Sequence, residues 1–221
     1  MLRARRLDVG DTLNVTNGQG QVAVAKIADV AARRDKLRVI LSGVESIPKP
    51  GVATVLMGAL PKGDRQSTML DMSTQLGMTH FYPLSCEYGV QRANPKMFER
   101  WRRIMREASK QCRQPHFPVL GDEVELRRVL SDNQDQALLL YADAEGIAME
   151  QLFSHGRIDS KGHTIESVIL LVGPEGGFSQ GEIEYLEQSK AIPIALGRYV
   201  LRTETAAISM LAGLNQIRYK L

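Results

Sequence analysis

The chain of 221 residues is poor in cysteine, in aromatic residues and in long apolar runs. Its two cysteines, Cys86 and Cys112, have no metal-ligand spacing around them, which argues against a disulfide scaffold and a zinc ribbon. No apolar run approaches the roughly 20 residues that cross a bilayer, and the first residues lead straight into polar ones. We therefore expect neither a membrane span nor a leader, and predict a cytoplasmic globular protein.

The excess of positive over negative charge is small overall but large in two segments of the chain. The formal net charge is only +3, yet residues 92–114 hold eight lysines and arginines against two glutamates. Residues 1–40 hold eight basic and four acidic residues, and the rest of the chain is acidic on balance. Clustered basic residues indicate a polyanionic partner, because phosphates favour such clusters through counterion release. A solvated helix face would explain the same charges.

Residues 1–50 have the pattern of a small β module. Alternating apolar residues at 12–15 and 21–24 flank Asn17-Gly18, a strong hairpin turn, and a third strand-like run covers 36–41. Pro48-Lys49-Pro50-Gly51 ends this part, and we place a domain boundary there. A module of this size has little core, and its strand-like start follows Met1 almost directly, so we expect an N-terminal strand or two of a complete barrel to be short or missing.

From residue 51 onwards, strand-like runs alternate with helical ones, which predicts a mostly parallel sheet covered on both faces. The helix expected at 95–112 has Asn94 as its N-cap and Pro95 at its first position. Its apolar residues, Trp101 among them, fall on one stripe, and its basic residues fall on the opposite face. The other expected helices lie at 64–76, 179–189 and 205–219, and the expected strands at 52–57, 80–84, 137–141, 168–172 and 192–196.

Two loops that each join a strand to a helix are the best candidates for a site. The first contains Gly173-Pro174-Glu175-Gly176-Gly177, and ligands of open α/β sheets bind at such carboxyl ends of strands. It has no Gly-Lys-Ser/Thr and so is no Walker loop, although a simple tight turn would also use these glycines. The second runs from Leu196 to Thr205. Thr203 can cap the following helix and Glu204 can favour its dipole, but neither role accounts for Arg202 beside them.

Taken together, the two loops resemble the RsmE-type family, the small-subunit ribosomal RNA uridine-N3 methyltransferases of the SPOUT superfamily. The resemblance is carried by residues 173–179 (GPEGGFS) and 196–206 (LGRYVLRTETA), in the family's order and place. Weaker matches lie at 2–11, 17–20, 62–65 and 75–77. The resemblance thus extends over most of the chain.

The resemblance implies an α/β fold in two parts: a PUA-like β-barrel over residues 1–50 and a methyltransferase domain over residues 51–221. In that family the second part holds a deep trefoil knot, through which the subunits form a homodimer. The knotted loops bind S-adenosylmethionine in a bent form, largely through backbone atoms. Ribosomal RNA is the implied partner, held by the barrel and the basic helix. No metal is implied, and the four histidines (His80, His116, His155 and His163) share no ligand spacing.

Site residues follow from the resemblance and from the chemistry of the reaction. The thioether that leaves a sulfonium donor needs no acid, whereas uridine N3 must lose a proton and carries anionic character that a fixed guanidinium stabilises. We assign that role to Arg202, with Glu204 orienting Arg202 or relaying the proton. The expected cofactor-binding residues are Leu171, Val172, Gly173, Pro174, Glu175, Gly176, Leu196, Gly197, Leu201, Arg202 and Thr203. The expected RNA contacts are Arg3, Arg5, Arg6, Lys62, Arg65, Arg100, Arg103, Arg106 and Arg113.

Four positions depart from the family pattern while the cofactor loops stay intact. Met72 and Gln75 replace a lysine and a glutamate, Tyr88 replaces an arginine after the second strand, and Lys110 replaces a glutamate. Two alternatives therefore stay open. One is a non-catalytic RNA-binding protein of the same fold, and the other is a related methyltransferase with a different RNA target.

Overall fold

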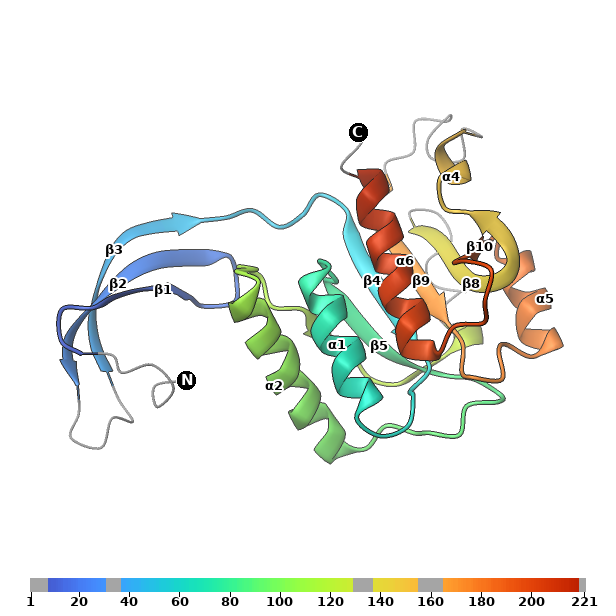
Figure 1. Cartoon of the computed structure of the whole chain (residues 1–221), viewed down its shortest axis with the longest axis horizontal. Coiled ribbons are helices and arrows are strands. Elements are labelled where there is room, and N and C mark those ends of the chain that lie inside the picture. Colours follow the sequence, from blue (N-terminus) through green and yellow to red (C-terminus); the bar gives the residue numbers. More distant parts are fainter. Residues whose placement is uncertain (1–7, 31–36, 129–136, 155–164, 219–221) are drawn as a thin grey trace.

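The computed structural model describes residues 8–30, 37–128, 137–154 and 165–218. They form a small antiparallel sheet that stands apart from a larger α/β body (Figure 1). The small sheet has the order β1-β2-β3. Its strands are β1 (Thr12–Thr16), β2 (Gln21–Val30) and β3 (Leu37–Ser46).

The body is built on a seven-stranded sheet of order β10-β8-β9-β4-β5-β6, with β7 also pairing with β5, and the pairings are parallel. Its strands are β4 (Ala53–Gly58), β5 (His80–Ser85), β6 (Val119–Leu120), β7 (Val124–Glu125), β8 (Ala137–Ala148), β9 (Ser167–Val172) and β10 (Ile192–Ala195). The helices are α1 (Arg65–Gln75), α2 (Pro95–Gln111), α4 (Gln151–Ser154), α5 (Gln180–Gln188) and α6 (Thr203–Arg218).

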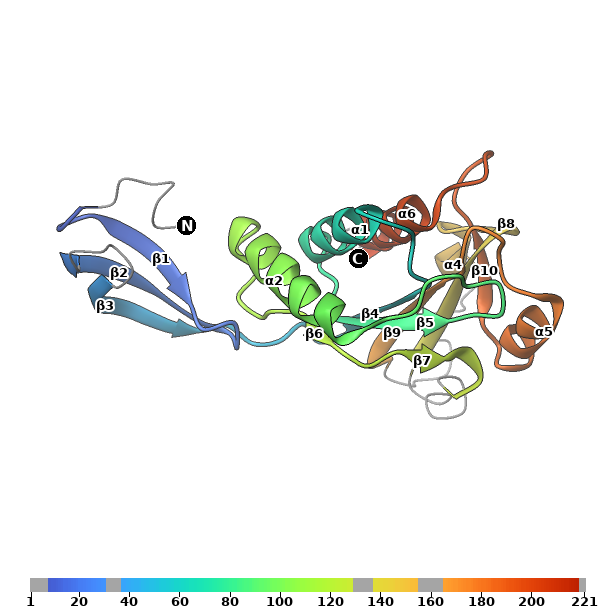
Figure 2. The ribbon, with the colours of Figure 1, turned by 90° about the horizontal axis from the view of Figure 1, so that it is seen from below.

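Alternate residues of the central strands supply two cores, one on each face of this sheet. Leu56, Leu140 and Leu170 are level in register and lie in the core shared with α1, α2 and α6. The neighbouring Ile169 lies in the other core, with Leu186 of α5. Figure 2 shows α1, α2 and α6 along one side of the sheet. The prediction of a parallel sheet covered on both faces is confirmed.

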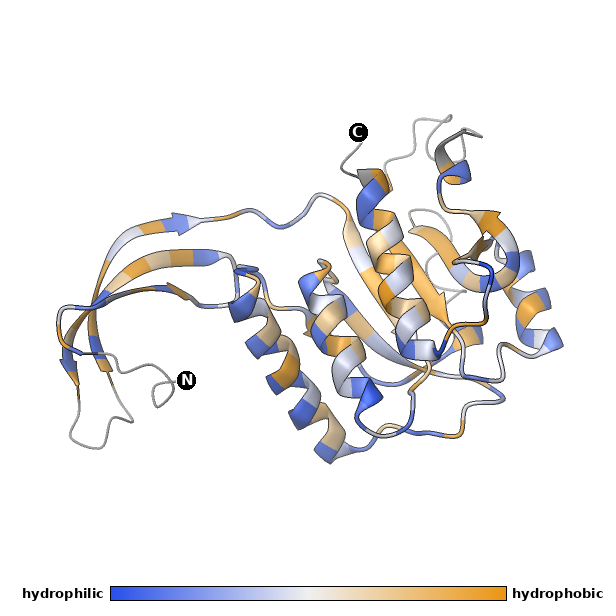
Figure 3. Cartoon of the chain, viewed as in Figure 1, coloured by the Kyte–Doolittle hydropathy of each residue, from blue (hydrophilic) through white to orange (hydrophobic). Residues whose placement is uncertain are grey.

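Helix α2 has the two faces that its sequence predicts. The side chain of Asn94 accepts the N–H of Met97 at 3.2 Å, which caps the helix. Trp101 is 1% exposed and packs edge-on against Phe81, with 6.1 Å between ring centroids, so it is a core residue and no platform for bases. Hydrophilic residues recur along the exposed side of α2 (Figure 3).

The strands and helices of the body differ from the expected ones at a few boundaries. Helix α6 begins two residues earlier, because the carbonyl of Arg202 accepts the N–H of Ala206 at 2.8 Å. Strand β8 continues seven residues further, and β10 pairs with it across a register shift after Pro193. A Cβ at Gly146 would lie 2.5 Å from the β10 backbone, so this approach needs glycine. The short elements β6, β7 and α4 were not expected.

The β1–β2 hairpin forms as predicted and rests on the segment that follows α2. Gly20 donates its N–H to the carbonyl of Pro115 at 3.0 Å, and Phe117 donates to the carbonyl of Gly18 at 2.9 Å. A Cβ on Gly18 would lie 2.3 Å from the Phe117 ring, so this contact is built on glycine. Together these contacts fasten the small sheet to the body.

The described part of the small sheet is open and not a closed barrel, since β1 and β3 form its two edges. Three apolar residues of β3 are exposed: Ile40, Leu41 and Val44. Whether residues 1–50 complete a PUA-like barrel and form a separate domain stays a prediction.

Candidate functional site

The two loops expected to form the site meet at the carboxyl edge of the parallel sheet. The first loop (173–179) follows β9 and the second loop (196–202) follows β10. Thr203, the first residue of α6, donates its hydroxyl to the carbonyl of Gly173 at 3.3 Å. The carbonyl of Val172 in turn accepts the N–H of Ala59 at 2.8 Å. The ends of the strands therefore form a fixed floor for the site, and the first loop is bonded to the start of α6, directly after the second loop.

Turn geometry in the first loop uses its glycines. Gly177 has φ +74° and donates its N–H to the carbonyl of Pro174 at 2.9 Å, which closes a turn. A Cβ on Gly176 would lie 3.4 Å from Tyr88, whose side chain is exposed beside this loop. The side chains of Leu171 and Val172 lie in the two cores, so these residues can offer a ligand only their backbone.

A cluster of three charged side chains lies where the loops meet the start of α1. Arg65 Nη1 lies 3.4 Å from Glu175 Oε1 and 3.8 Å from Glu204 Oε2. Glu204 is almost fully buried in the first turn of α6, and its Oε2 has no hydrogen-bond partner within the described structure. Arg65 was predicted to contact RNA, yet it lies among the expected cofactor residues.

Arg202 has a different setting from its neighbour Glu204. Its side chain is exposed, and it forms no ion pair with any residue in the described ranges. The cation next to Glu204 is therefore Arg65, so the structure does not bring Glu204 and Arg202 together as the predicted pair. Of the other expected cofactor residues, Leu196 and Leu201 are partly buried against the core. Gly197 has φ +141°, with open space where a side chain would stand.

These residues fit a ligand of the kind that the resemblance implies. The buried Glu204 oxygen and the Glu175 carboxylate supply negative charge, which suits a sulfonium cation. Partly buried leucines suit the flat apolar faces of an adenine. Backbone groups around Gly176 and Gly197 are exposed and within reach of a ligand.

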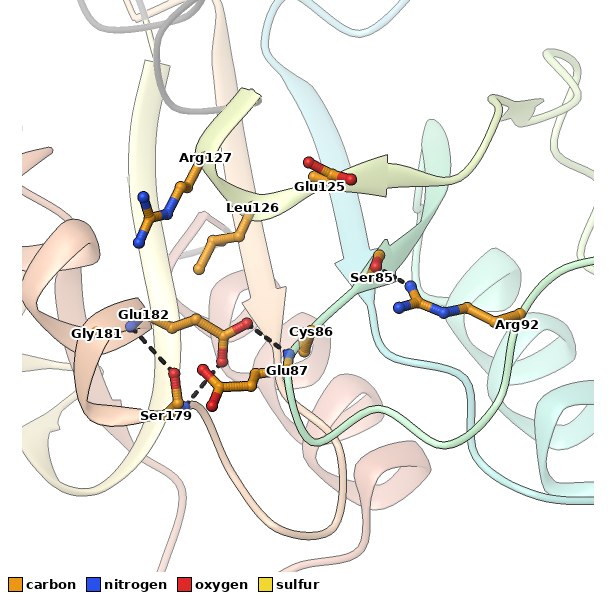
Figure 4. Close-up of a pocket in the computed structure, with 10 residues that line it drawn as sticks. All are labelled: Ser85, Cys86, Glu87, Arg92, Glu125, Leu126, Arg127, Ser179, Gly181 and Glu182. Atoms are coloured by element: carbon orange, nitrogen blue, oxygen red, sulfur yellow. Dashed lines mark hydrogen bonds between the residues drawn. The ribbon is translucent and has the colours of Figure 1, made fainter.

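A crevice of about 300 Å³ opens beside this site, between the ends of β5 and β7 and the start of α5 (Figure 4). Glu182 joins its walls: one carboxylate oxygen accepts the N–H of Glu87 at 2.9 Å, and the other accepts the N–H of Ser179 at 2.8 Å. Ser179 completes the predicted capping box by accepting the N–H of Glu182. Arg92 bonds to Ser85 on the opposite wall.

Two titratable groups at the ends of β5 have shifted pKa values: Cys86 directly after the strand and His80 at its start. Burial, with a smaller contribution from the nearby Glu182 carboxylate, raises the pKa of the Cys86 thiol to about 12. Burial lowers the pKa of His80, as does the charge of Lys49. His80 bonds to Thr79 and His116 bonds to the carbonyl of Ile47, which are structural roles. His155 and His163 lie outside the described residues.

The expected RNA contacts are distributed over several elements. Arg103, Arg106 and Arg113 are exposed on α2 and just after it, and Lys62 is exposed before α1. Arg100 is also exposed, but its guanidinium bonds to Asp64 and Ser67, both at 2.8 Å. Arg3, Arg5 and Arg6 lie outside the described residues. Their contact with RNA stays a prediction.

Sequence reasoning missed the roles of Arg65 and Glu182. The capping box signalled Glu182, but nothing local indicated its bond to Glu87. Across the described ranges, no group of three or more His, Cys, Asp or Glu residues could hold a metal ion. Nor is any described helix long and apolar enough to cross a membrane.

Known proteins resemble this chain over nearly its full length. Residues 48–215 match the RNA methyltransferase domain family. Ribosomal RNA small subunit methyltransferase E of Bacillus subtilis is 26% identical over 219 residues, which cover 97% of this chain and 85% of that protein. The protein of the same name from Rickettsia conorii is 31% identical over 210 residues, which cover 94% and 81%.

A solved structure agrees with these sequence matches. A methyltransferase of Legionella pneumophila in complex with S-adenosylmethionine has a TM-score of 0.81 and 27% identity, covering 96% of this chain and 85% of that chain. The family match over residues 48–215 includes both loops and the strands that precede them. The chain belongs to the ribosomal RNA small subunit methyltransferase E family.

Proposed function

We propose that this protein transfers the methyl group of S-adenosylmethionine to N3 of a uridine in small-subunit ribosomal RNA. The observation that carries this proposal is the joined pair of loops at the carboxyl edge of the sheet. The bond from Thr203, directly after the second loop, to Gly173 in the first lies next to the buried Glu204 carboxylate, whose Oε2 has no hydrogen-bond partner in the described structure. The family membership of the chain supports the same reaction.

The cofactor would be held mainly by backbone. We assign its binding to the groups of residues 171–176 and 196–197, with Leu196 and Leu201 against the adenine and Thr203 fixing the two loops together. When bound, S-adenosylmethionine supplies an electrophilic methyl group on a positively charged sulfur. Glu175 and Glu204 place negative charge on the side of the site that this cation would face.

Two residues would act on the uridine. Glu204 Oε2 is a buried acceptor with no partner in the described structure, so we assign it the N3 proton. Arg202 carries an exposed guanidinium that no described ion pair neutralises, so it can stabilise the negative charge that spreads to the uracil oxygens. This division of roles replaces the idea that Glu204 orients Arg202.

RNA would be held by positive charge on α2. Arg103 and Arg106 project from its exposed face, where they can contact phosphates and position the target without reading sequence. The small sheet would contact a second part of the same RNA. With ribosomal RNA as the proposed substrate, we also propose a cytoplasmic location.

We also propose that the protein is a homodimer joined at a knotted C-terminal region. The second loop exposes Tyr199 and Val200 to 78% and 91%. Adjacent exposed apolar side chains next to a site are typical of surfaces that a partner covers. A second subunit at this place would also shield the reaction from water.

The reaction is tested with purified protein, small ribosomal subunits and S-adenosylmethionine, and by mass spectrometry of the digested RNA. We expect 3-methyluridine with the native protein and none with Arg202→Ala. Calorimetry with S-adenosylhomocysteine should show binding that Gly176→Val abolishes, because a branched side chain would cover the exposed backbone that we assign to the cofactor. Gly181→Val, at a position with open space, is the matched control.

Two other outcomes of these experiments would each favour one of the two alternatives that the sequence leaves open. Cofactor binding without any methylated RNA would contradict catalysis and favour the non-catalytic RNA-binding protein. A methyl group on another base or another RNA would favour the related methyltransferase with a different target.

A further inference from the structure

Arg65 stands between two carboxylates that belong to different parts of the site. Its Nη1 is 3.4 Å from Glu175 in the first loop and 3.8 Å from Glu204 in the first turn of α6. Its Nε donates to the carbonyl of Lys62 at 3.3 Å, which anchors the same guanidinium to the turn before α1. One side chain therefore connects the segment between β4 and α1 to both halves of the site.

This setting differs from that of a phosphate-binding arginine. The Arg65 side chain is 33% exposed, and its nearest charged neighbours are two carboxylates, which a phosphate would have to displace or approach against repulsion. Arg103 and Arg106 on α2, by contrast, are exposed and have no salt-bridge partner in the described structure. The predicted RNA contact is thus the weaker explanation for Arg65.

The second carboxylate gives Arg65 a more specific role. Glu204 has a side chain only 10% exposed, and a carboxylate so placed requires a nearby counter-charge. At 3.8 Å the Arg65 guanidinium supplies that charge but lies beyond hydrogen-bond distance. The lone pairs of Glu204 Oε2 therefore remain unused.

We propose that Arg65 is a positioning residue for methyl transfer. It fixes Glu175 and Glu204 relative to each other across the site, and it leaves Glu204 Oε2 without a hydrogen bond, so that its lone pairs are available to the uracil proton. This inference rests on the proposed function for the role of Glu204. The link between Arg65 and Glu175 does not depend on it.

The first test separates positioning from RNA contact by kinetics. Arg65→Met should lower kcat by about tenfold or more, because a misplaced carboxylate slows the chemical step, while KM for the RNA stays within about twofold. Arg65→Lys should restore part of the lost kcat, since it returns the charge without the rigid fork. Lys190→Met removes an exposed cation between the end of α5 and the start of β10, the ends of these elements that face away from the two loops, and should change neither constant. A raised KM with unchanged kcat in Arg65→Met would overturn the proposal.

The second test needs no turnover. Arg65→Met and Glu175→Gln should each weaken S-adenosylhomocysteine binding about threefold to fivefold in calorimetry, and the double variant should lose little more than either one. Additive losses would overturn the link between the two residues. If the native protein methylates no ribosomal RNA, the proposed function fails, yet this cycle still decides whether Arg65 and Glu175 act together. Thermal unfolding of each variant confirms that the protein remains folded.

Discussion

Glu182 in α5 accepts the backbone N–H of Glu87 at 2.9 Å, a bond between residues 95 positions apart in the chain. The same side chain caps its own helix through Ser179. The loop after β5, which carries Tyr88, is thereby fastened to the segment that follows the first loop. Tyr88 and Gly176 face each other because one carboxylate holds both of their loops.

Glu182→Ala should destabilise the protein by about 2 kcal/mol, because it removes the acceptor for two backbone N–H groups. Denaturant unfolding monitors this loss. Glu184→Ala, two residues along the same helix, loses only an exposed bond to Gln180 and should cost less than about 0.5 kcal/mol. Equal losses in the two variants would contradict the role of Glu182.

Thr203→Val should weaken S-adenosylhomocysteine binding by about fivefold, because it removes the 3.3 Å bond that joins α6 to Gly173 at a cost of about 1 kcal/mol. Thr203→Ser keeps the hydroxyl and should bind within about twofold of the native protein. Calorimetric titration measures both. If serine proved as harmful as valine, the methyl group and not the hydrogen bond would be the relevant contact.

Gly18→Ala should reduce RNA affinity and leave S-adenosylhomocysteine binding unchanged, because an added Cβ would lie 2.3 Å from Phe117 and push the small sheet off the body. Gly43→Ala is the matched control, since Gly43 also has a positive φ but has open space around it. A filter-binding assay compares the two variants. The same loss of affinity in both would mean that backbone strain, and not displacement of the sheet, is responsible.

Replacing Arg103 and Arg106 with glutamine should flatten the salt dependence of RNA binding, lowering the slope of log K against log salt by about one to two units. Arg100→Gln should change it less, because that guanidinium already bonds to Asp64 and Ser67. Affinities measured over a series of KCl concentrations give the slopes. An unchanged slope in the double variant would place the phosphates elsewhere.

Iodoacetamide should label Cys112 and spare Cys86 in the native protein at pH 9, since Cys86 is buried and its pKa is raised to about 12. Intact-mass spectra count the adducts, and denatured protein should take two.

Because the native pKa of Cys86 lies above the ordinary value of 9.0, its contribution to stability is complete below pH 9 and is lost as the pH rises towards 12. Cys86→Ala should remove this loss of stability between pH 9 and about 12. Rapid labelling of both cysteines in the folded protein would contradict the burial of Cys86.

Elements with local signals were predictable from the sequence. Helix α2 carries its own cap and a clear apolar stripe, and the β1–β2 hairpin carries its own turn residues. The sequence predicts that α6 starts near Thr205 with Thr203 as its cap, whereas the backbone bond from Ala206 to Arg202 makes Thr203 the first helical residue. Strands β6 and β7 have two residues each, too few for any period to show.

The two loops of the site were predictable as motifs, but the side chains that organise them were not. Glu204 was expected to contact its neighbour Arg202, whereas its partner Arg65 begins a helix that is distant in sequence. Composition and motif spacing predict the local structure of one segment, but not its contacts with distant segments. Pairings such as Arg65 with Glu204 depend on how parallel strands bring separate loops to one edge.

The pairing of β4 with β9 has a consequence for synthesis of the chain. Ala53 opposes Ser167, so the middle of the sheet closes only after 114 further residues have been added. Contacts of such long range form slowly, and until then β4 exposes an apolar edge to other nascent chains. A product that stops before residue 167 retains α1 and α2 but lacks β9, which pairs with one edge of β4. We therefore expect truncated chains to aggregate instead of accumulating as folded fragments.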